Sequence, residues 1–286
     1  MIFDTRISEL GEGPLWQAER QMLWWFDILN GRLHGQGGDG SITFEFPEMV
    51  SAMGLVNRDI AVIAGESGLW RVNLNDGGHR LFVRIEAGQP ETRSNDGRAD
   101  RQGGFWWGTM GMRGGEDPGK GAIWRWYRGE TRRLFAGVTI PNAICFSLDG
   151  TQAYFADTVT KRVMRVGLDA EGWPQGTPMT FLDLRAEGLE PDGAVIDAEG
   201  RMWLAQWGAS RVACYAPDGR FLSALPVRAP HSSCPAFGGP GLTTLYVTTA
   251  RSGMTPEALA ACPDAGKVFV LEGAGQGVAE AMVRLD

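Results

Sequence analysis

One short pattern recurs along this chain at intervals of 40 to 50 residues, and it constrains the fold more than any other feature. In its three clearest copies, a polar residue stands five positions before an Asp or Ser and eight before a Gly, and an aromatic-rich strand follows. These copies begin at Asn95, Asn142 and Asp192. Each copy reads as two strands joined by a tight turn, which is the signature of a β-hairpin.

Three weaker copies begin at Glu12, at Ser51 or Ala52, and at Ser233. Six copies, each long enough for about four strands, have the period of a propeller blade. We therefore predict an all-β fold, a six-bladed β-propeller formed by residues 1–286 as a single domain. An aligned β-sandwich does not explain the repeat. Either the opening residues 3–7 or the closing residues 281–285 could complete a blade, and one short helix is expected at 256–260.

Composition narrows the possible partners. The net charge is -7 and no Lys/Arg-rich segment appears, which argues against nucleic acid. No window of the chain is apolar enough to span a membrane, and no signal peptide is visible. The four cysteines form no C-x-x-C pair, so we expect buried free thiols and a cytoplasmic location. His34 and His79 are expected at the surface. Nothing in the sequence indicates the oligomeric state.

The first position of each repeat is the most informative for function. In a propeller the innermost strand of every blade lines the central channel, so equivalent positions converge on the axis. Here they include two carboxylates, Glu12 and Asp192, and two amides, Asn95 and Asn142. Clustered buried carboxylates are costly unless a cation or proton relieves them. Such oxygen ligands suit Ca²⁺, Mg²⁺ or Mn²⁺, and also Zn²⁺ or Fe²⁺. The sequence therefore predicts one divalent metal cation on the axis. In the alternative interpretation, these residues only cap the channel through hydrogen bonds.

Several stretches around these positions resemble the gluconolactonase/regucalcin (SMP-30) family. They lie between residue 10 and about residue 250, in the expected order, and include Gly11-Glu12-Gly13-Pro14, Arg93-Ser94-Asn95-Asp96-Gly97, Gly108-Thr109-Met110, Pro141-Asn142 and Pro191-Asp192-Gly193. The resemblance implies a six-bladed propeller with one divalent metal, and lactone hydrolysis as its activity. It also implies that Glu12, Asn142 and Asp192 bind the metal. Arg93 and Asn95 would hold the hydroxyls of the sugar.

One position departs from the family pattern. Many members have an acid three residues beyond the Met of the G-T-M stretch, where it contacts substrate. This chain has Arg113 there, and Glu116 three residues further on. An arginine donates hydrogen bonds, so Arg113 either binds a substrate carboxylate or points to solvent. Whether Arg113 or Glu116 contacts substrate stays open at this point.

These observations together predict a metal-dependent hydrolase that opens the ring of a sugar lactone to the aldonic acid. A small-molecule sugar lactone is the expected partner, and Asp192 is the expected general base. Two other functions are possible for the same scaffold: hydrolysis of organophosphates or aryl esters, and calcium binding without catalysis. A serine or cysteine hydrolase would have to use Ser233 or Cys234 with His231, but no G-x-S-x-G elbow is present.

Overall fold

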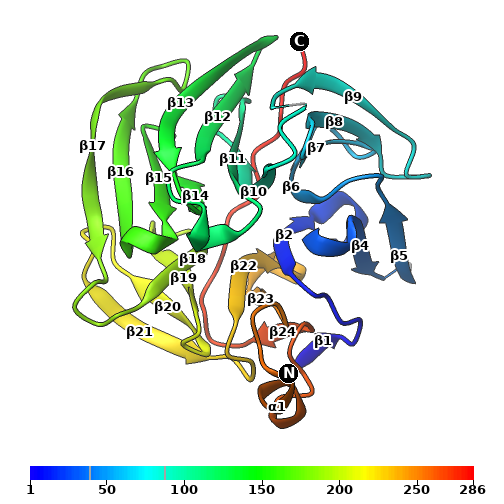
Figure 1. Cartoon of the computed structure of the whole chain (residues 1–286), viewed down its shortest axis with the longest axis vertical. Helices are drawn as coiled ribbons and strands as arrows, with labels where there is room; N and C mark the ends of the chain where they lie inside the picture. Colours follow the sequence, from blue (N-terminus) through cyan, green and yellow to red (C-terminus); the bar gives the residue numbers. More distant parts are fainter. Residues whose placement is uncertain (39, 87) are drawn as a thin grey trace.

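A computed structural model describes residues 1–38, 40–86 and 88–286. These residues form six four-stranded antiparallel sheets arranged around a common axis (Figure 1). The first strand of each sheet contacts the first strands of both neighbouring sheets, so the six inner strands form a closed ring. The predicted all-β, six-bladed propeller is confirmed.

Each sheet is built largely from consecutive strands, listed here from the axis outward. The first three sheets are β2 (Gly11–Gln17), β3 (Met22–Asp27), β4 (Arg32–Gly37) and β5 (Gly40–Glu45); β6 (Val50–Leu55), β7 (Ile60–Gly65), β8 (Gly68–Asn73) and β9 (His79–Arg84); and β10 (Thr92–Ala99), β11 (Phe105–Gly111), β12 (Gly121–Tyr127) and β13 (Glu130–Val138). The last three are β14 (Pro141–Phe146), β15 (Gln152–Asp157), β16 (Arg162–Leu168) and β17 (Pro174–Asp183); β18 (Glu190–Ile196), β19 (Met202–Trp207), β20 (Arg211–Tyr215) and β21 (Phe221–Pro226); and β22 (Ser232–Gly238), β23 (Thr244–Thr249), β24 (Val268–Leu271) and β1 (Ile2–Asp4).

Helical segments are few and short. The predicted helix is present as α1 (Pro256–Ala261), where the side chain of Thr255 accepts a hydrogen bond from the Ala258 N–H and so caps the first turn. Single 3₁₀ turns occur at η1 (Ala18–Arg20), η2 (Ile28–Asn30), η3 (Gly114–Glu116), η4 (Thr158–Thr160) and η5 (Pro240–Leu242). None of the helices in the described ranges has the length and apolar character needed to cross a bilayer.

The ring is closed by the N-terminal strand. β1 pairs antiparallel with β24, with Ile2 opposite Phe269, so the sixth blade contains both early and late residues. Of the two segments that could have completed a blade, the opening one does so, whereas residues 281–285 form no strand.

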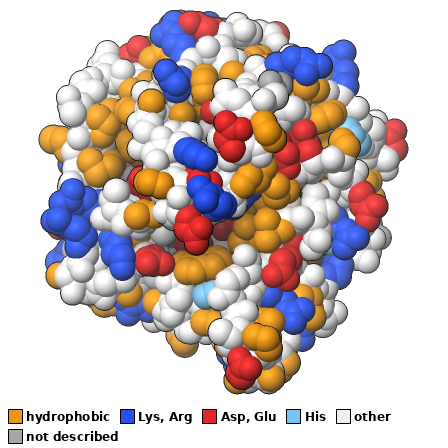
Figure 2. Space-filling view, viewed as in Figure 1, with side chains coloured by type: hydrophobic (Ala, Val, Ile, Leu, Met, Phe, Trp, Pro, Cys, Tyr) orange, Lys and Arg blue, Asp and Glu red, His pale blue; other side chains and the backbone are white. Residues whose placement is uncertain are grey.

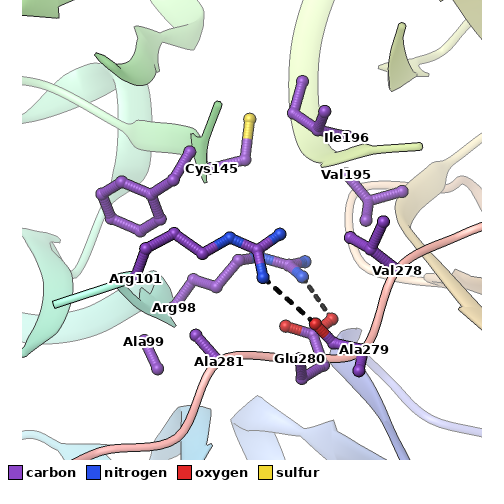
Figure 3. Close-up of a pocket in the computed structure, with 11 residues that line it drawn as sticks. Arg98, Ala99, Arg101, Cys145, Val195, Ile196, Val278, Ala279, Glu280 and Ala281 are labelled. Carbon is purple, nitrogen blue, oxygen red and sulfur yellow. Dashed lines mark hydrogen bonds and ion pairs between the residues drawn. The ribbon is translucent and has the colours of Figure 1, made fainter. Parts of the chain in front are cut away.

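The C-terminal segment instead crosses one face of the propeller (Figure 1). At this face, the first strand of each blade leads into the second. The Val283 N–H donates to the Leu55 carbonyl at 2.7 Å, and the Arg284 N–H donates to the Gly103 carbonyl at 2.9 Å. Figure 3 shows the small cavity beneath this segment, where Arg98 pairs with Glu280 at 2.6 Å. Both side chains are largely buried. The segment therefore links several blades at this end of the molecule.

The repeat that identified the fold has a clear structural basis. In three of the six copies, the residue five positions after the start accepts a hydrogen bond from a tryptophan on the next strand. Gln17 accepts from Trp24 at 2.9 Å, and the equivalent contacts join Asp100 to Trp106 at 3.1 Å and Asp197 to Trp203 at 2.9 Å. The two aspartates also accept backbone N–H groups of their own turns. The polar residue thus fixes the hairpin turn and satisfies a buried indole N–H.

The core consists of the inner and middle strands. Trp24, Trp25, Trp106 and Trp107 are fully buried, and burial of each such side chain contributes on the order of 2 kcal/mol or more. His79 is exposed, as expected. The expectation for His34 was wrong, since this side chain is buried in β4 between Trp25 and Thr43. The neighbours Leu33 and Gly35 are buried as well, so both faces of β4 are covered and a side chain on either face is enclosed.

Candidate functional site

A pocket of about 390 Å³ opens at the end of the axis opposite the C-terminal segment. Figure 2 shows this face hollowed near its centre, with acidic and basic side chains around the hollow. The volume lies in the range of pockets that bind small molecules. The lining includes Leu10, Glu12, Arg93, Asn95, Met110, Ile140, Asn142, Thr158, Glu190, Asp192, Trp207 and Ser252.

Four of the six first positions of the repeat line this pocket. They are Glu12 on β2, Asn95 on β10, Asn142 on β14 and Asp192 on β18. The other two form buried hydrogen bonds between strands instead. Ser51 donates to the hydroxyl of Ser94 at 2.8 Å, and Ser233 is hydrogen-bonded to the hydroxyl of Thr248 at 2.9 Å. The polar groups are therefore contributed by the first, third, fourth and fifth blades.

Irregular backbone places these side chains at the pocket. Strand pairing shifts register immediately after Glu12 and Asn142, and across the stretches that contain Asn95 and Asp192. Such bulges turn side chains away from the regular alternation of a strand. At Gly193, a side chain would place its Cβ only 2.3 Å from Sγ of Cys234, so glycine permits the fifth and sixth inner strands to approach next to Asp192.

A chain of hydrogen bonds joins the third, fourth and fifth blades at the pocket. Nη1 of Arg93 donates to Oδ1 of Asn95 at 2.9 Å, and Nδ2 of Asn95 donates to Oδ1 of Asn142 at 3.0 Å. Nδ2 of Asn142 then donates to Oγ1 of Thr158 at 2.9 Å, and Thr158 donates to the Pro191 carbonyl at 2.8 Å. These bonds fix both amide orientations, so Oδ1 of Asn142 is held as an acceptor within the pocket.

The two carboxylates lie close together in a buried environment. Glu12 is 6% exposed and Asp192 is 4% exposed. Burial, reinforced by the negative charge of Asp96, raises the pKa of Glu12 from 4.5 to about 8. Burial also raises the pKa of Asp192 well above its ordinary value, and the adjacent charge of Glu12 adds to this effect. The positive charge of Arg93 opposes these shifts without cancelling them, so the pair on its own favours the protonated forms.

The donor atoms of this site fit a divalent cation. Two carboxylates and the Oδ1 atom of Asn142 are hard oxygen ligands, and a cation would offset the burial and mutual repulsion of the two acids. Over the described ranges, no group of three or more His, Cys, Asp or Glu side chains is arranged to hold a metal ion. Any cation at this site would thus depend on the amide as well as on the acids.

The two arginines predicted to contact substrate lie in different environments. Arg93 is 8% exposed and lines the pocket. The Arg113 side chain is 64% exposed and forms an ion pair with Asp117 at 2.6 Å, and it is not among the residues that line the pocket. The neighbouring residues Gly114 and Gly115 do line it. The substrate contact of Arg113 therefore stays a prediction.

The structure does not bring His231 together with Ser233 or Cys234 as a nucleophile and base. The His231 ring stacks on Trp207, with 4.1 Å between ring centroids, and its Nδ1 is paired with the Ser252 carbonyl. Burial raises the pKa of the Cys234 thiol well above its ordinary value, which keeps the sulfur protonated and inert.

The pocket residues that the sequence did not indicate include Thr158, Glu190 and Trp207. Thr158 directly follows the second strand β15 and Trp207 is the last residue of the second strand β19, whereas the repeat marks only first strands. Glu190 stands two residues before Asp192 on the same strand, so its place on β18 could have indicated it.

The fold and the site together define a class: a six-bladed propeller whose axial pocket combines two buried carboxylates with two amides. Residues 10–251 match the family model described as SMP-30/Gluconolactonase/LRE-like region. The chain belongs to this family.

Named relatives cover almost the whole chain. The 6-deoxy-6-sulfogluconolactonase of Pseudomonas putida is 34% identical over 276 residues, 96% of this chain and 94% of that protein. The L-arabinolactonase of Azospirillum brasilense is 34% identical over 289 residues, 98% of this chain and 94% of that protein. Among solved structures, regucalcin from Agrobacterium tumefaciens, described as a calcium-binding protein, has a TM-score of 0.96 at 38% identity. The match covers 99% of this chain and 97% of that one.

Proposed function

We propose that this protein is a lactonase that opens the ring of a sugar lactone to the aldonic acid. The observation that carries the proposal is the placement of Glu12, Asn142 and Asp192 in one axial pocket of a chain that belongs to this family. Relatives named as lactonases share about a third of its residues over nearly the full length.

Arg93 and Asn95 would orient the substrate. Nη1 of Arg93 is occupied by Asn95 and the Ser94 carbonyl, and both Arg93 and Asn95 line the pocket. The rest of the guanidinium can donate to ring hydroxyls, because arginine carries five N–H donors in a fixed plane. Holding the ring in one orientation presents its carbonyl carbon to the attacking water and lowers the entropic part of the barrier.

Asp192 would move the proton. In its ionised form it accepts a proton from the water that attacks the carbonyl carbon, and a tetrahedral intermediate forms. When the bond between the carbonyl carbon and the ring oxygen breaks, Asp192 returns the proton to that oxygen. The products are an aldonic acid and the regenerated carboxylate, so protons balance over the cycle.

Glu12, Asn142 and Asp192 would hold one divalent cation, either Ca²⁺, Zn²⁺, Mg²⁺, Mn²⁺ or Fe²⁺. When bound, the cation supplies Lewis acidity, which favours negative charge on the lactone carbonyl oxygen. Asn95 would contribute indirectly, by keeping Oδ1 of Asn142 turned toward the site.

Proton release from a panel of substrates tests the proposal. The panel contains aldonolactones, an aryl ester and an organophosphate triester, each assayed before and after chelation and after return of single metal ions. We expect hydrolysis of aldonolactones that disappears on chelation and returns with one or more ions. Preferred hydrolysis of the ester or triester would support a different hydrolase. Tight calcium binding without turnover of any substrate would support a non-enzymatic propeller.

A further inference from the structure

Glu190 and Trp207 form a second polar and aromatic pair at the pocket. They are directly opposite each other where β18 pairs with β19, and both line the pocket. Glu190 precedes Asp192 by two residues on the same strand. The pair therefore stands on the fifth blade, beside the carboxylate to which we assign proton transfer, and has no role in that chemistry.

Trp207 is held in a fixed orientation. One face of its indole stacks on His231, with an interplanar angle of 16°, and the side chain packs against the core cluster that contains Leu10 and Ala250. The buried indoles of Trp24, Trp106 and Trp203 donate their N–H to a side chain, whereas those of Trp16, Trp25 and Trp107 have no partner among the described residues. Trp207 makes no such hydrogen bond within the residues that the structure describes. The part of the side chain that is not covered by His231 or the core cluster lines the pocket and is available to a ligand there.

Glu190 offers an acceptor beside this indole. Its side chain is 42% exposed and forms a long ion pair with Lys161 at 3.4 Å. Lys161 also donates to the Gly188 carbonyl at 3.1 Å, which anchors the ammonium group. An exposed pair at this distance is weak, and it leaves acceptor sites of the carboxylate unused.

We propose that Glu190 and Trp207 bind the hydroxylated part of the substrate and make the enzyme selective for uncharged sugar lactones. This inference rests on the proposed function and names the substrate class of the same site. A sugar ring presents C–H groups on its faces and O–H donors at its edge. The indole can pack against the C–H groups of the ring face, and the carboxylate can accept hydrogen bonds from the O–H groups at its edge.

The negative charge of Glu190 determines which lactones are disfavoured. A substrate with a carboxylate or sulfonate on its tail would bring like charges together at the fifth blade, which disfavours binding. Family membership does not decide this point, since one relative is named for a sulfonated lactone and another for a neutral pentose lactone. In this chain, the preference between neutral and charged lactones therefore depends on residues such as Glu190.

The test compares three lactones: an unsubstituted δ-valerolactone, a neutral gluconolactone, and a glucarolactone that carries a carboxylate. For Trp207→Leu we expect kcat/KM for gluconolactone to fall about tenfold more than for δ-valerolactone, chiefly through KM. Trp207→Phe should recover part of the loss. For Glu190→Gln, the preference for gluconolactone over glucarolactone should fall by about tenfold. Glu187→Gln removes an exposed acid outside the pocket and serves as the matched control.

Two results would overturn the inference. Equal losses on δ-valerolactone and gluconolactone in Trp207→Leu would mean that Trp207 is only structural. An unchanged preference between neutral and charged lactones in Glu190→Gln would remove the role of its charge.

A binding measurement separates this inference from the proposed function. 1,5-Anhydroglucitol has the hydroxylated ring but no carbonyl, so it can bind without reacting. Calorimetry should show binding to the wild type that weakens in Trp207→Leu and Glu190→Gln. If the wild type hydrolyses no lactone, the proposed function fails, and binding lost in both variants would still support hydroxyl recognition. If the wild type does not bind this ring, hydroxyl recognition fails as well.

Discussion

Nδ2 of Asn95 donates a 3.0 Å hydrogen bond to Oδ1 of Asn142, and this bond joins the third blade to the fourth at the pocket. The same Asn95 amide donates to the Pro141 carbonyl at 2.9 Å. Because Nδ2 of Asn142 is directed to Thr158, the orientation of the Asn142 amide is determined from both sides. The site therefore depends on contacts between blades as well as on the residues of any single blade.

Replacement of Asn95 should weaken the site without unfolding the protein. In Asn95→Ala, Asn142 loses the donor that orients its Oδ1 atom, and partners of this kind typically change metal affinity or activity by about 10- to 100-fold. We expect a loss in that range for divalent-ion affinity, measured by calorimetry, and for lactone turnover. Asn75→Ala, at an exposed asparagine, is the control. Unaltered ion affinity in Asn95→Ala would show that Asn142 does not need this contact.

The metal-free protein should lose stability as pH rises through the weakly acidic and neutral range. Burial raises the pKa of Glu12 to about 8, above its ordinary 4.5. Between these values the folded state holds more protons than the unfolded state, so the free energy of unfolding decreases with increasing pH. Glu12→Gln should flatten this dependence in denaturant titrations of chelated protein. A wild type and variant with the same slope would contradict the raised pKa.

The buried His34 should make the protein less stable as the pH falls, which is opposite to the effect of Glu12. Burial, followed by the positive charge of Arg6, lowers the pKa of His34 from 6.5 to about 4. Between these values the unfolded state binds the additional proton, so stability falls as pH drops from 6.5 toward 4. His34→Gln should reduce this acid sensitivity relative to the wild type, while His79→Gln, at an exposed histidine, should not. Urea titrations at several pH values provide the comparison.

The C-terminal segment should matter more for stability than for catalysis. In Glu280→Gln, Arg98 keeps its buried position but loses its counter-charge, and breaking a buried pair on one side costs roughly 3 kcal/mol. We expect a decrease of that size in the free energy of unfolding, with KM for the lactone unchanged. A wild-type free energy of unfolding in Glu280→Gln would mean that solvent already stabilises the positive charge of Arg98.

The repeat was enough to predict the fold from the sequence. Its first positions predicted which inner-strand side chains meet, because equivalent residues of six blades must converge on one axis. Glu12, Asn95, Asn142 and Asp192 do line one pocket. The equivalent Ser51 and Ser233 do not, since their short hydroxyls find partners between the strands. Side-chain length, and not register alone, decides which positions reach the pocket.

Other features had no periodic signal. Thr158 begins the 3₁₀ turn after β15 and Trp207 is the last residue of β19, so neither lies on an inner strand that the repeat marks. The path of the C-terminal segment depends on single contacts, such as Val283 with Leu55 and Glu280 with Arg98. Contacts between residues this far apart in the chain cannot be read from local spacing.

The proposed hydrolysis depends most on proton transfer by Asp192. The direct measurement is kcat/KM for gluconolactone hydrolysis by Asp192→Asn, at saturating divalent ion, with folding verified by circular dichroism and ion binding verified by calorimetry. We predict that turnover falls by at least about 100-fold, because the amide cannot accept the proton of the attacking water. A folded, metal-loaded Asp192→Asn protein that retains wild-type kcat/KM would rule out Asp192 as the general base.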